Sequence, residues 1–326
     1  MLLRLLKDLF GGTPTRPPVE NRREVAREHL DRAFAAHSQG RLTDAFTELT
    51  RAADLTPEDL SVRFALAEVA YLSGDRLTAL EYCERLRRVP EGLQATDMLM
   101  SLIRFQGEFY FDVLQRILAA LEPRTYLETG VFRGESLRLV KAPTLAIGID
   151  PEPELAGPLE ANQRVFAETS DDFFAKHDVR AEFGGLPIDL GFIDGMHRFE
   201  YALRDFANIE RHSTPQSTIL IHDCYPLDRV TAERDRIRTF WSGDIWRLVV
   251  LLKKYRPELA INTIATAPTG LTVVRNLDPS SRLLMERHDE LCREFLALDY
   301  SYIEDDMPGK LSLFPNDWGK VQALFA

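Results

Sequence analysis

The chain has 326 residues, of which 45% are hydrophobic and 28% charged, and its formal net charge is -11. This length favours two domains, and the acidic balance argues against a nucleic-acid backbone as main partner, because phosphate binding needs a basic surface. No apolar run of the sequence reaches the roughly 20 residues of a membrane span. The three cysteines have no CxxC spacing, so we expect a protein of the reducing cytoplasm, without a disulfide framework or a zinc knuckle.

Residues 1–20 are treated as a separate amphipathic segment and linker. In MLLRLLKDLFGG (1–12), apolar residues recur at helical spacing around Arg4 and Lys7, which predicts a short helix. Such a helix either touches a membrane surface or a partner, or packs on the body of the protein. GGTPTRPP (11–18) then predicts a linker.

Residues 21–95 are helical by pattern and contain an internal repeat. Gly40 and Gly74 lie 34 residues apart, each placed to end one helix and permit a turn. Small residues keep this offset in the pairs Ala33 and Ala67, Ala36 and Ala70, and Ala45 and Ala79. The period resembles that of the tetratricopeptide repeat. The resemblance implies an α-helical domain with a protein partner, although two full repeats are marginal as an independent solenoid.

A second domain is expected over residues 96–326, where short β-rich runs alternate with helical patterns from Arg124 onward. Such alternation predicts a parallel sheet with helices on both faces, and ligands of such sheets bind beyond the carboxyl ends of the strands. The predicted strands are 124–130, 144–150, 163–169, 188–194 and 217–223, and the helices between them are 135–141, 171–177 and 198–212.

The C-terminal part is unlike a dinucleotide-binding half-domain, which continues with parallel strands. The sequence predicts a helical region (231–259), an antiparallel hairpin (260–268 and 271–279), a helix (281–298) and a polar tail. The expected architecture is therefore an α/β, Rossmann-like sheet with a terminal antiparallel hairpin, preceded by the helical repeats.

Acidic residues gather at the strand ends. Four predicted strands end in an acid or an acid-containing turn: Glu128, Asp150, Asp194 and Asp223. Asp150 lies 20 residues after Gly130, where an acid accepts both ribose hydroxyls of a nucleoside. Ser170 and Asp171 close the third strand. They either meet the edge of an adenine ring or cap the helix that follows.

The turn after the first predicted strand has the spacing ExGxxxG, within YLETGVFRGESL (126–137). Gly130 lets the chain turn tightly and lets a ligand approach the backbone, and Gly134 allows close helix contact. Ser136 offers a hydroxyl near a helix N-terminus, whose exposed amides favour an anion. We group all three with the candidate cofactor-binding residues, against the alternative of a plain strand-helix turn.

These features together resemble the class I S-adenosylmethionine (SAM)-dependent methyltransferases. The nearest subgroup has FIDGxH after the fourth strand, then a helix of the YEGVLRDL type, and HD at the end of the fifth strand. Here these read FIDGMHRFEYALRDF (192–206) and ILIHD (219–223). The resemblance covers about residues 105–280 and is specific for fold and cofactor rather than for substrate. It implies that Glu128, Gly130 and Gly134 line the methionine end of SAM, with Glu128 facing the ammonium group, that Asp150 holds the ribose, and that Ser170 and Asp171 lie near the adenine.

The subgroup is similar to metal-dependent sugar O-methyltransferases, which hold a divalent metal between the fourth-strand aspartate and an acidic pair ending the fifth strand. Asp194 and Asp223 match two metal positions, and His197 matches the base of that family. His222 departs from the pattern, because an acid is expected there. Carboxylates and water suit Mg²⁺ and imidazole suits softer metals. The metal is thus Mg²⁺ or another divalent ion, with His222 as an extra ligand or a structural hydrogen-bonding residue, or no metal is bound.

We therefore expect an enzyme that methylates a small hydroxylated acceptor, such as a sugar or glycoside, with His197 removing the hydroxyl proton. Trp241 and Trp246 are candidates for an apolar wall over the acceptor, with Asp244 and Arg247 touching it. In the alternative without a functional role, Asp194 caps the next helix and His197 is an exposed residue of its first turn. A rival hypothesis is a protein-binding module, in which the repeats capture a partner and the methyltransferase-like domain is a scaffold of low or no activity.

Overall fold

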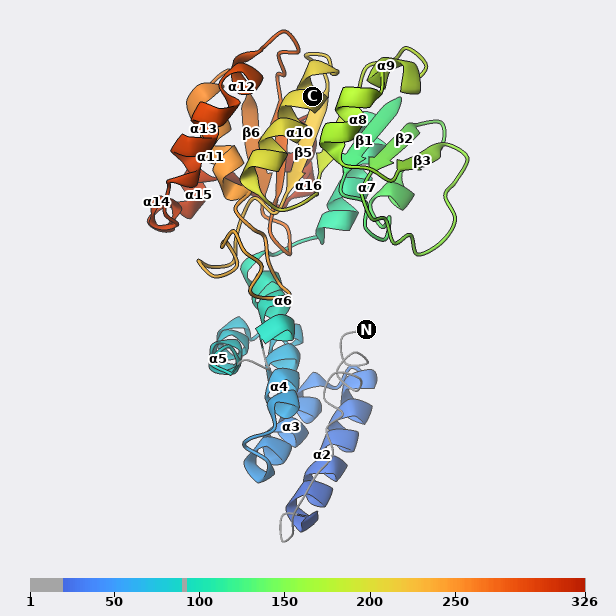
Figure 1. Cartoon of the computed structure of the whole chain (residues 1–326). Helices are drawn as coiled ribbons and strands as arrows, with labels where there is room; N and C mark the ends of the chain where they lie inside the picture. Colours follow the sequence, from blue (N-terminus) through green and yellow to red (C-terminus); the bar gives the residue numbers. More distant parts are fainter. Residues whose placement is uncertain (1–19, 90–92, 326) are drawn as a thin grey trace. The chain divides into compact units, whose positions relative to one another are not determined.

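The computed structural model describes residues 20–89 and 93–325, and the chain divides after Arg104 into two compact units (Figure 1). The predicted boundary at residue 96 falls inside a helix, because the last helix of the N-terminal unit continues to Arg104. The amphipathic segment expected over 1–20 lies, except for Glu20, outside the described residues.

The N-terminal unit consists of helices joined by tight turns. They are α2 (Glu20–Ser38), α3 (Leu42–Leu55), α4 (Leu60–Leu72), α5 (Arg76–Leu86) and α6 (Leu93–Arg104). The 34-residue offset holds in the structure, since α2 and α4 end 34 residues apart and α3 and α5 begin 34 apart. Gly40 and Gly74 have φ angles of 73° and 84° at the two turns, which only glycine adopts at little cost. The alanines at the repeated positions are buried between the helices. Membership of the tetratricopeptide family stays a prediction.

An eight-stranded sheet forms the centre of the second unit, in the order β3-β2-β1-β4-β5-β7-β6-β8. The first five strands are parallel, and β7 runs antiparallel between β5 and β6. This confirms the Rossmann-like parallel sheet with its terminal antiparallel hairpin. The strands are β1 (Thr125–Thr129), β2 (Leu145–Ile149), β3 (Gln163–Phe166), β4 (Leu190–Ile193), β5 (Thr218–His222), β6 (Ala260–Ile264), β7 (Leu271–Arg275) and β8 (Leu313–Phe314).

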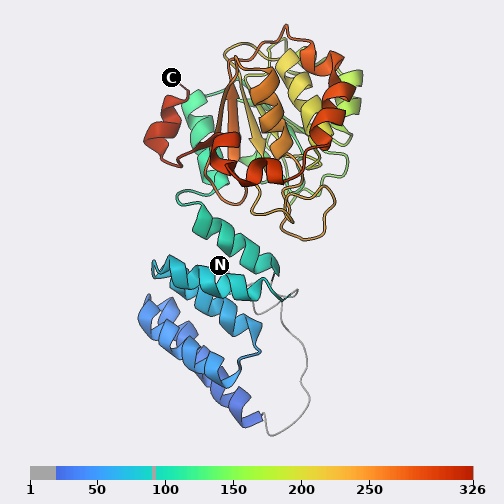
Figure 2. The same cartoon turned by 90° about the vertical axis from the view of Figure 1, so that its left-hand side faces the viewer.

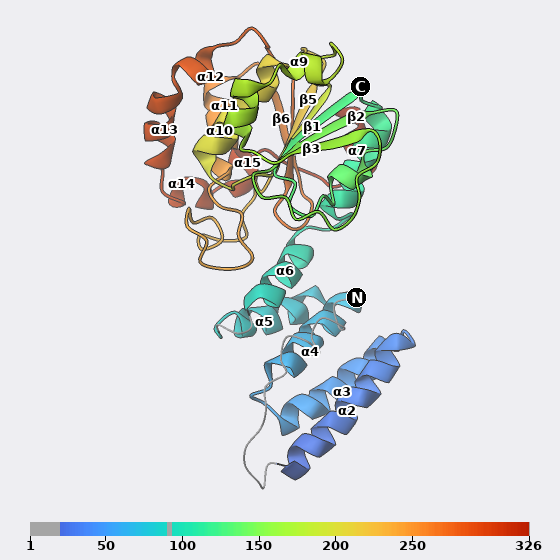
Figure 3. The same ribbon diagram turned by 45° about the vertical axis from the view of Figure 1, so that its right-hand side comes forward.

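Helices cover both faces of this sheet, as Figure 2 and Figure 3 show. On one face, α7 and α16 bury apolar side chains against the central strands. On the other lie α10, α11 and α13. The helices of the unit are α7 (Tyr110–Leu121), α8 (Ser170–Lys176), α9 (Val179–Glu182), α10 (Phe199–Arg211), α11 (Trp246–Tyr255), α12 (Leu283–Glu286), α13 (His288–Leu296), α14 (Ser301–Glu304), α15 (Met307–Lys310) and α16 (Trp318–Ala323).

Three predicted elements are wrong in extent. The helix expected over 135–141 is one short 3-10 turn, η2 (Leu137–Leu139). The helix does not continue because the carbonyls of Leu137 and Val140 accept hydrogen bonds from the side-chain amide of Gln163. The helical region expected over 231–259 contains only α11, and residues 228–245 form turns that include Gly243 at a φ of 63°. The helix expected over 281–298 is interrupted at Arg287, between α12 and α13.

The predicted polar tail is also wrong. β8 extends the sheet as a parallel neighbour of β6, and α16 buries Val321 in the core beneath the central strands. The apolar residues of this segment are too widely spaced for a clear periodic pattern, and only the open edge of β6 gives β8 its partner. Among the described residues, no helix combines the length and the apolar character needed to cross a bilayer.

Candidate functional site

The glycine turn after β1 lies directly against the end of β4. Gly130 has a φ of 86°, and a Cβ atom at this position would lie 2.1 Å from the backbone oxygen of Asp194. The amide of Asp194 in turn donates to the carbonyl of Thr129 at 2.9 Å. A glycine is thus needed at position 130 because the protein's own backbone, at the end of β4, occupies the space that a side chain would take. A ligand's approach to this backbone stays a prediction.

Asp150 ties the end of β2 to this glycine turn. Its Oδ2 accepts hydrogen bonds from the amides of Val131 (2.9 Å) and Phe132 (2.8 Å), and its Oδ1 accepts one from the amide of Glu152 (2.8 Å). Each carboxylate oxygen has two lone pairs, so Oδ1 keeps one lone pair that these amides do not use. Phe132, with a φ of 45°, is exposed on the same turn.

Glu128 is buried beneath the turn rather than exposed on it. It accepts hydrogen bonds from the hydroxyls of Tyr126 (2.6 Å) and Ser136 (3.2 Å). Burial raises the pKa of Glu128 to about 8, despite these bonds. At neutral pH its carboxyl group is mostly protonated, which is a poor partner for an ammonium group. Ser136 likewise faces Glu128, and its hydroxyl is buried, while Gly134 adopts a φ of 74° against Leu155.

At the end of β3, Asp171 is already paired. Both of its oxygens accept hydrogen bonds from the guanidinium of Arg204 on α10, at 2.8 and 2.7 Å. Helix α8 is capped by Thr169, whose hydroxyl accepts a hydrogen bond from the amide of Asp172, and Ser170 is the first residue of α8.

The sequence analysis missed Asp205, a buried acid of α10 near Ser170. Burial raises the pKa of Asp205 to about 6.

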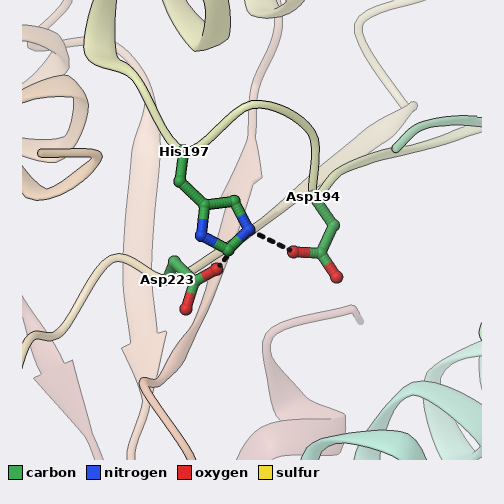
Figure 4. Close-up of side chains that lie close together, drawn as sticks. All are labelled: Asp194, His197 and Asp223. Atoms are coloured by element: carbon green, nitrogen blue, oxygen red, sulfur yellow. Dashed lines mark ion pairs between the residues drawn. The ribbon is translucent and has the colours of Figure 1, made fainter. Parts of the chain in front are cut away.

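Four polar side chains converge beyond the ends of β4 and β5. Nε2 of His197 lies 3.0 Å from Oδ2 of Asp223 and 3.6 Å from Oδ1 of Asp194 (Figure 4). Nδ1 of His222 lies 3.1 Å from Oδ1 of Asp194 and 3.3 Å from Oδ2 of Asp223. The two strand ends quoted in the sequence motifs thus share one cluster. We call these four residues the His-Asp cluster.

Charge governs the protonation of this cluster. Burial by itself lowers the pKa of both histidines, but the two carboxylates outweigh it and raise His197 to about 9 and His222 to about 10. Burial also disfavours ionised Asp194, yet the two histidines lower the pKa of its carboxyl to about 2. In the absence of a further cation, the two carboxylates therefore favour the protonated form of both imidazoles.

The loop before α11 holds His197 in place. Nδ1 of His197 donates to the carbonyl of Trp241 at 3.2 Å, and the two rings stack with centroids 5.3 Å apart. Gly243 is required here, because a Cβ atom would lie 1.9 Å from the carbonyl oxygen of His197. Both His197 (φ 54°) and Asp223 (φ 60°) occupy the left-handed region that side chains disfavour, as strained functional residues often do.

The other two cluster residues are fixed by neighbours far away in the sequence. The hydroxyl of Thr269 donates to Oδ1 of Asp223 at 2.6 Å. Tyr110, at the start of α7, packs against the ring of His222, with the centroids 4.2 Å apart and the rings tilted by 30°. None of these partners lies in a recognisable sequence motif. The only local signals are Gly243, two residues after Trp241, and the position of Thr269 in the predicted hairpin turn.

Several predicted neighbours of the acceptor lie elsewhere. Trp246 is fully buried in the core, so it forms no wall. Asp244 is buried as well, accepting hydrogen bonds from the amide of Phe199 (2.7 Å) and from Arg234 (3.0 Å). Arg247 donates to the carbonyls of Phe295 and Leu298. Of this set, Trp241 lies beside the cluster with its ring, and Asp244 contacts it only through its backbone amide, which donates to the carbonyl of His197 at 3.3 Å.

Cys224, next to the cluster, is a buried residue rather than a nucleophile. Its side chain is fully buried, and its Sγ lies 3.5 Å from the carbonyl oxygen of Ile221. Burial raises the pKa of the thiol above its usual range. A thiol without a populated thiolate is inert, which favours a structural role for this residue.

The cluster fits a divalent metal ion by its donor atoms. Asp194, His197 and Asp223 each offer one ligand atom, and these three atoms lie within 4.8 Å of one another. Together with His222 they line a cavity of about 10 Å³, roughly the space that holds one water molecule. Carboxylate and imidazole are both common metal ligands. The cavity matches the size of a single ion.

Comparison with known proteins places the site within a recognised sequence pattern. Residues 127–224 match a family model described as a methyltransferase domain. This segment carries the glycine turn, Asp150 and the entire His-Asp cluster. No curated protein matches the chain.

Solved structures with similar folds include several methyltransferases. The O-methyltransferase TomG from Streptomyces achromogenes, in complex with SAM, is 16% identical, with 64% of this chain and 95% of that chain covered and a TM-score of 0.41. An O-methyltransferase from Bacillus cereus is 13% identical, with 61% and 97% covered and a TM-score of 0.40.

Proposed function

We propose that the protein is a SAM-dependent methyltransferase that transfers a methyl group to a hydroxyl of a small acceptor, such as a sugar or glycoside. The observation that carries the proposal is the His-Asp cluster, at the carboxyl ends of β4 and β5 beside the glycine turn of β1. The methyltransferase-domain match over 127–224 supports the cofactor. The substrate class rests on the resemblance of the FIDGMH and IHD motifs.

Three strand ends are assigned to the cofactor. The free lone pair of Asp150 Oδ1 is available to a ribose hydroxyl, and Ser170 and Asp171 border the neighbouring end of β3. The backbone at Gly130 and Gly134 is assigned to the methionine end, as the resemblance implies, while the side-chain positions of both glycines face the protein's own Asp194 and Leu155. Glu128 and Ser136 support this surface from below, because both are buried and hydrogen-bonded to each other.

The chemistry requires a methyl donor and a deprotonated acceptor. SAM, when bound, presents its methyl group on a positively charged sulfur. A hydroxyl is a poor nucleophile while protonated. Asp194 and Asp223 would hold a divalent metal ion, which would make the hydroxyl more acidic. His197 has two conceivable roles here, as the base expected from the resemblance or as a third metal ligand.

Calorimetry with SAM tests the proposal directly. We expect saturable binding of one SAM per chain, and methyl transfer to a panel of hydroxylated sugars when a divalent metal is present. Absence of heat at millimolar SAM would contradict the cofactor assignment. Binding of SAM with transfer only to nitrogen or carbon nucleophiles would contradict the acceptor assignment alone.

A protein partner of the helical repeats is a separate proposal. It is supported by the exposed leucines at the second repeat turn, since Leu72 is 48% and Leu77 82% exposed. In this proposal the repeats present a protein-bound or carrier-bound acceptor, or they capture a partner while the second unit serves as a scaffold. Capture of one defined protein by residues 20–104, lost on replacing both leucines with serine, supports the role. Unchanged capture contradicts it.

A further inference from the structure

The hydrogen bond of His197 to Trp241 determines which nitrogen of the imidazole is free. A carbonyl oxygen only accepts hydrogen bonds, so Nδ1 of His197 carries the proton that it donates to Trp241 at 3.2 Å. In the neutral ring Nε2 is then a lone pair. Metal-binding histidines commonly anchor their second nitrogen on a backbone carbonyl in this way.

Nε2 of His197 faces two acceptors and no donor within the cluster. Oδ2 of Asp223 lies 3.0 Å away and Oδ1 of Asp194 lies 3.6 Å away. A lone pair pointing at two carboxylates is repelled unless a cation lies between them. That cation is either a proton on Nε2 or a metal ion shared by all three side chains. In both states Nε2 is occupied and is not available as a base.

His222 supports the carboxylates from behind. Its Nδ1 lies 3.1 Å from Oδ1 of Asp194 and 3.3 Å from Oδ2 of Asp223, and the ring packs against the tilted ring of Tyr110. It therefore contacts one oxygen of each carboxylate that also faces His197. Outer hydrogen-bond partners of this kind orient metal ligands.

We propose that Asp194, His197 and Asp223 together ligate one divalent transition-metal ion, with the Trp241 carbonyl orienting His197 and the His222 ring orienting both carboxylates. The proposal rests on the proposed function for its role, since the ion lies where the acceptor hydroxyl would be activated. It replaces the expected role of His197 as the base.

The donor set also predicts which ions bind best. Two carboxylates and one imidazole match Mn²⁺, Co²⁺ or Zn²⁺ better than Mg²⁺, because Mg²⁺ prefers oxygen ligands while imidazole suits first-row transition metals. Removal of the imidazole leaves two carboxylates, which still suit Mg²⁺. The histidine therefore accounts for the difference between the two classes of ion.

Titration of the chelator-treated full-length protein with Mn²⁺ tests this. Mn²⁺ affinity is measured by electron paramagnetic resonance, and nitrogen coordination by its nuclear modulation. We expect one bound Mn²⁺ with a nitrogen signal, and an excess of Mg²⁺ should displace it poorly. His197→Gln should lose the nitrogen signal and weaken Mn²⁺ binding at least about 100-fold, beyond the roughly 10- to 100-fold of an outer-sphere change, while Mg²⁺ binding changes little.

Two histidine variants serve as comparisons. His222→Gln should keep the nitrogen signal and lose roughly 10- to 100-fold in affinity, as expected for an outer partner. His212→Gln, which alters a ring stacked on Phe174 at the end of α10, should match the wild type. The proposal is overturned if wild-type Mn²⁺ shows no nitrogen coupling, if His197→Gln retains it, or if Mg²⁺ binds as tightly as Mn²⁺.

SAM calorimetry on the same samples separates this proposal from the proposed function. Metal binding with the expected nitrogen signal but no SAM binding would refute the methyltransferase and leave the metal site standing. SAM binding and methyl transfer by a protein that takes up no Mn²⁺ would refute the metal site alone.

Discussion

Gly130 and Asp194 meet where β1 and β4 end, and their contact shows how single residues shape the site. The glycine is needed because the backbone of Asp194 occupies the space of a side chain. That close approach sets the position from which the carboxylate of Asp194 reaches the two histidines. Gly130 thus helps to align the His-Asp cluster although it lies outside the cluster and has no side chain.

Gly130→Ala should destabilise the second unit and disturb the cluster. Gly185→Ala is the matched control, since Gly185 has a similar φ of 92° but no atom within 4 Å of the place that a Cβ would take. The control bears only the backbone strain of a left-handed alanine, about 1 to 2 kcal/mol, whereas Gly130→Ala adds roughly 1 to 3 kcal/mol for the clash. All three tryptophans lie in the second unit, so urea denaturation followed by tryptophan fluorescence measures it. Equal losses in the two variants would contradict the clash.

Glu128 should make stability fall as pH rises. In the unfolded chain its carboxyl ionises near pH 4.3, while in the folded chain burial raises its pKa to about 8. The folded state binds more protons across this interval, so the free energy of unfolding decreases by up to about 1.4 kcal/mol per pH unit, and the effect ends above the folded pKa.

Glu128→Gln removes this titration and keeps the shape of the side chain. The variant should therefore gain stability relative to the wild type from about pH 5 to about pH 8, as measured by urea denaturation at several pH values. All other titrating groups are common to both proteins. A difference between them that stays constant with pH would show that Glu128 is ionised in the folded state.

Among the elements, α10 connects the sheet, the segment after β3 and the C-terminal helices. Its residue Arg204 pairs with Asp171 after β3, and at its far end Glu210 pairs with Arg256, the residue that caps α11. The Arg256–Glu210 pair is bidentate, at 2.7 and 2.8 Å, with both side chains almost fully buried. Glu210 also accepts from the amide of Asp278. This pair joins α10 to α11 and to the segment after β7.

Glu210→Gln should cost about 3 kcal/mol, since breaking a buried ion pair leaves a charge without its counterpart. Arg256 keeps its second partner, Glu258, which places the loss at the lower end of the usual range. In the exposed pair Arg287–Glu290, Glu290→Gln should cost much less, because water screens the two charges. Tryptophan fluorescence in urea compares the two variants. Similar losses from both would contradict a special role for burial.

The whole molecule consists of two units with separate cores. Every residue assigned to the cofactor or the metal lies in the second unit, and so does the entire sheet. In the first unit, α6 buries Leu99 and Ile103 against residues of α4 and α5. Helix α6 therefore belongs with the repeats, and not with the sheet as the boundary at residue 96 implies.

A fragment of residues 105–326 should fold alone and bind SAM within a few-fold of the full chain. A fragment of 96–326 is the control, because it would expose the apolar face of α6 and should associate at lower concentration. Calorimetry and light scattering compare the two with the full chain. A 105–326 fragment without a cooperative unfolding transition would contradict the independence of the second unit.

The sequence by itself determined the alternating elements, the parallel strands, the hairpin and the four acids at the strand ends, because each depends on short-range periodicity or spacing. It also placed Asp194, His197, His222 and Asp223 on adjacent strand ends. Only the tertiary structure decided what these groups face. Trp241, Thr269 and Tyr110 reach the cluster from distant segments, and Glu128 and Trp246 proved buried. Contacts between residues that are remote in the sequence determine the hydrogen-bond partners and the burial of each side chain. These in turn determine which side chains are charged. Local sequence patterns encode neither.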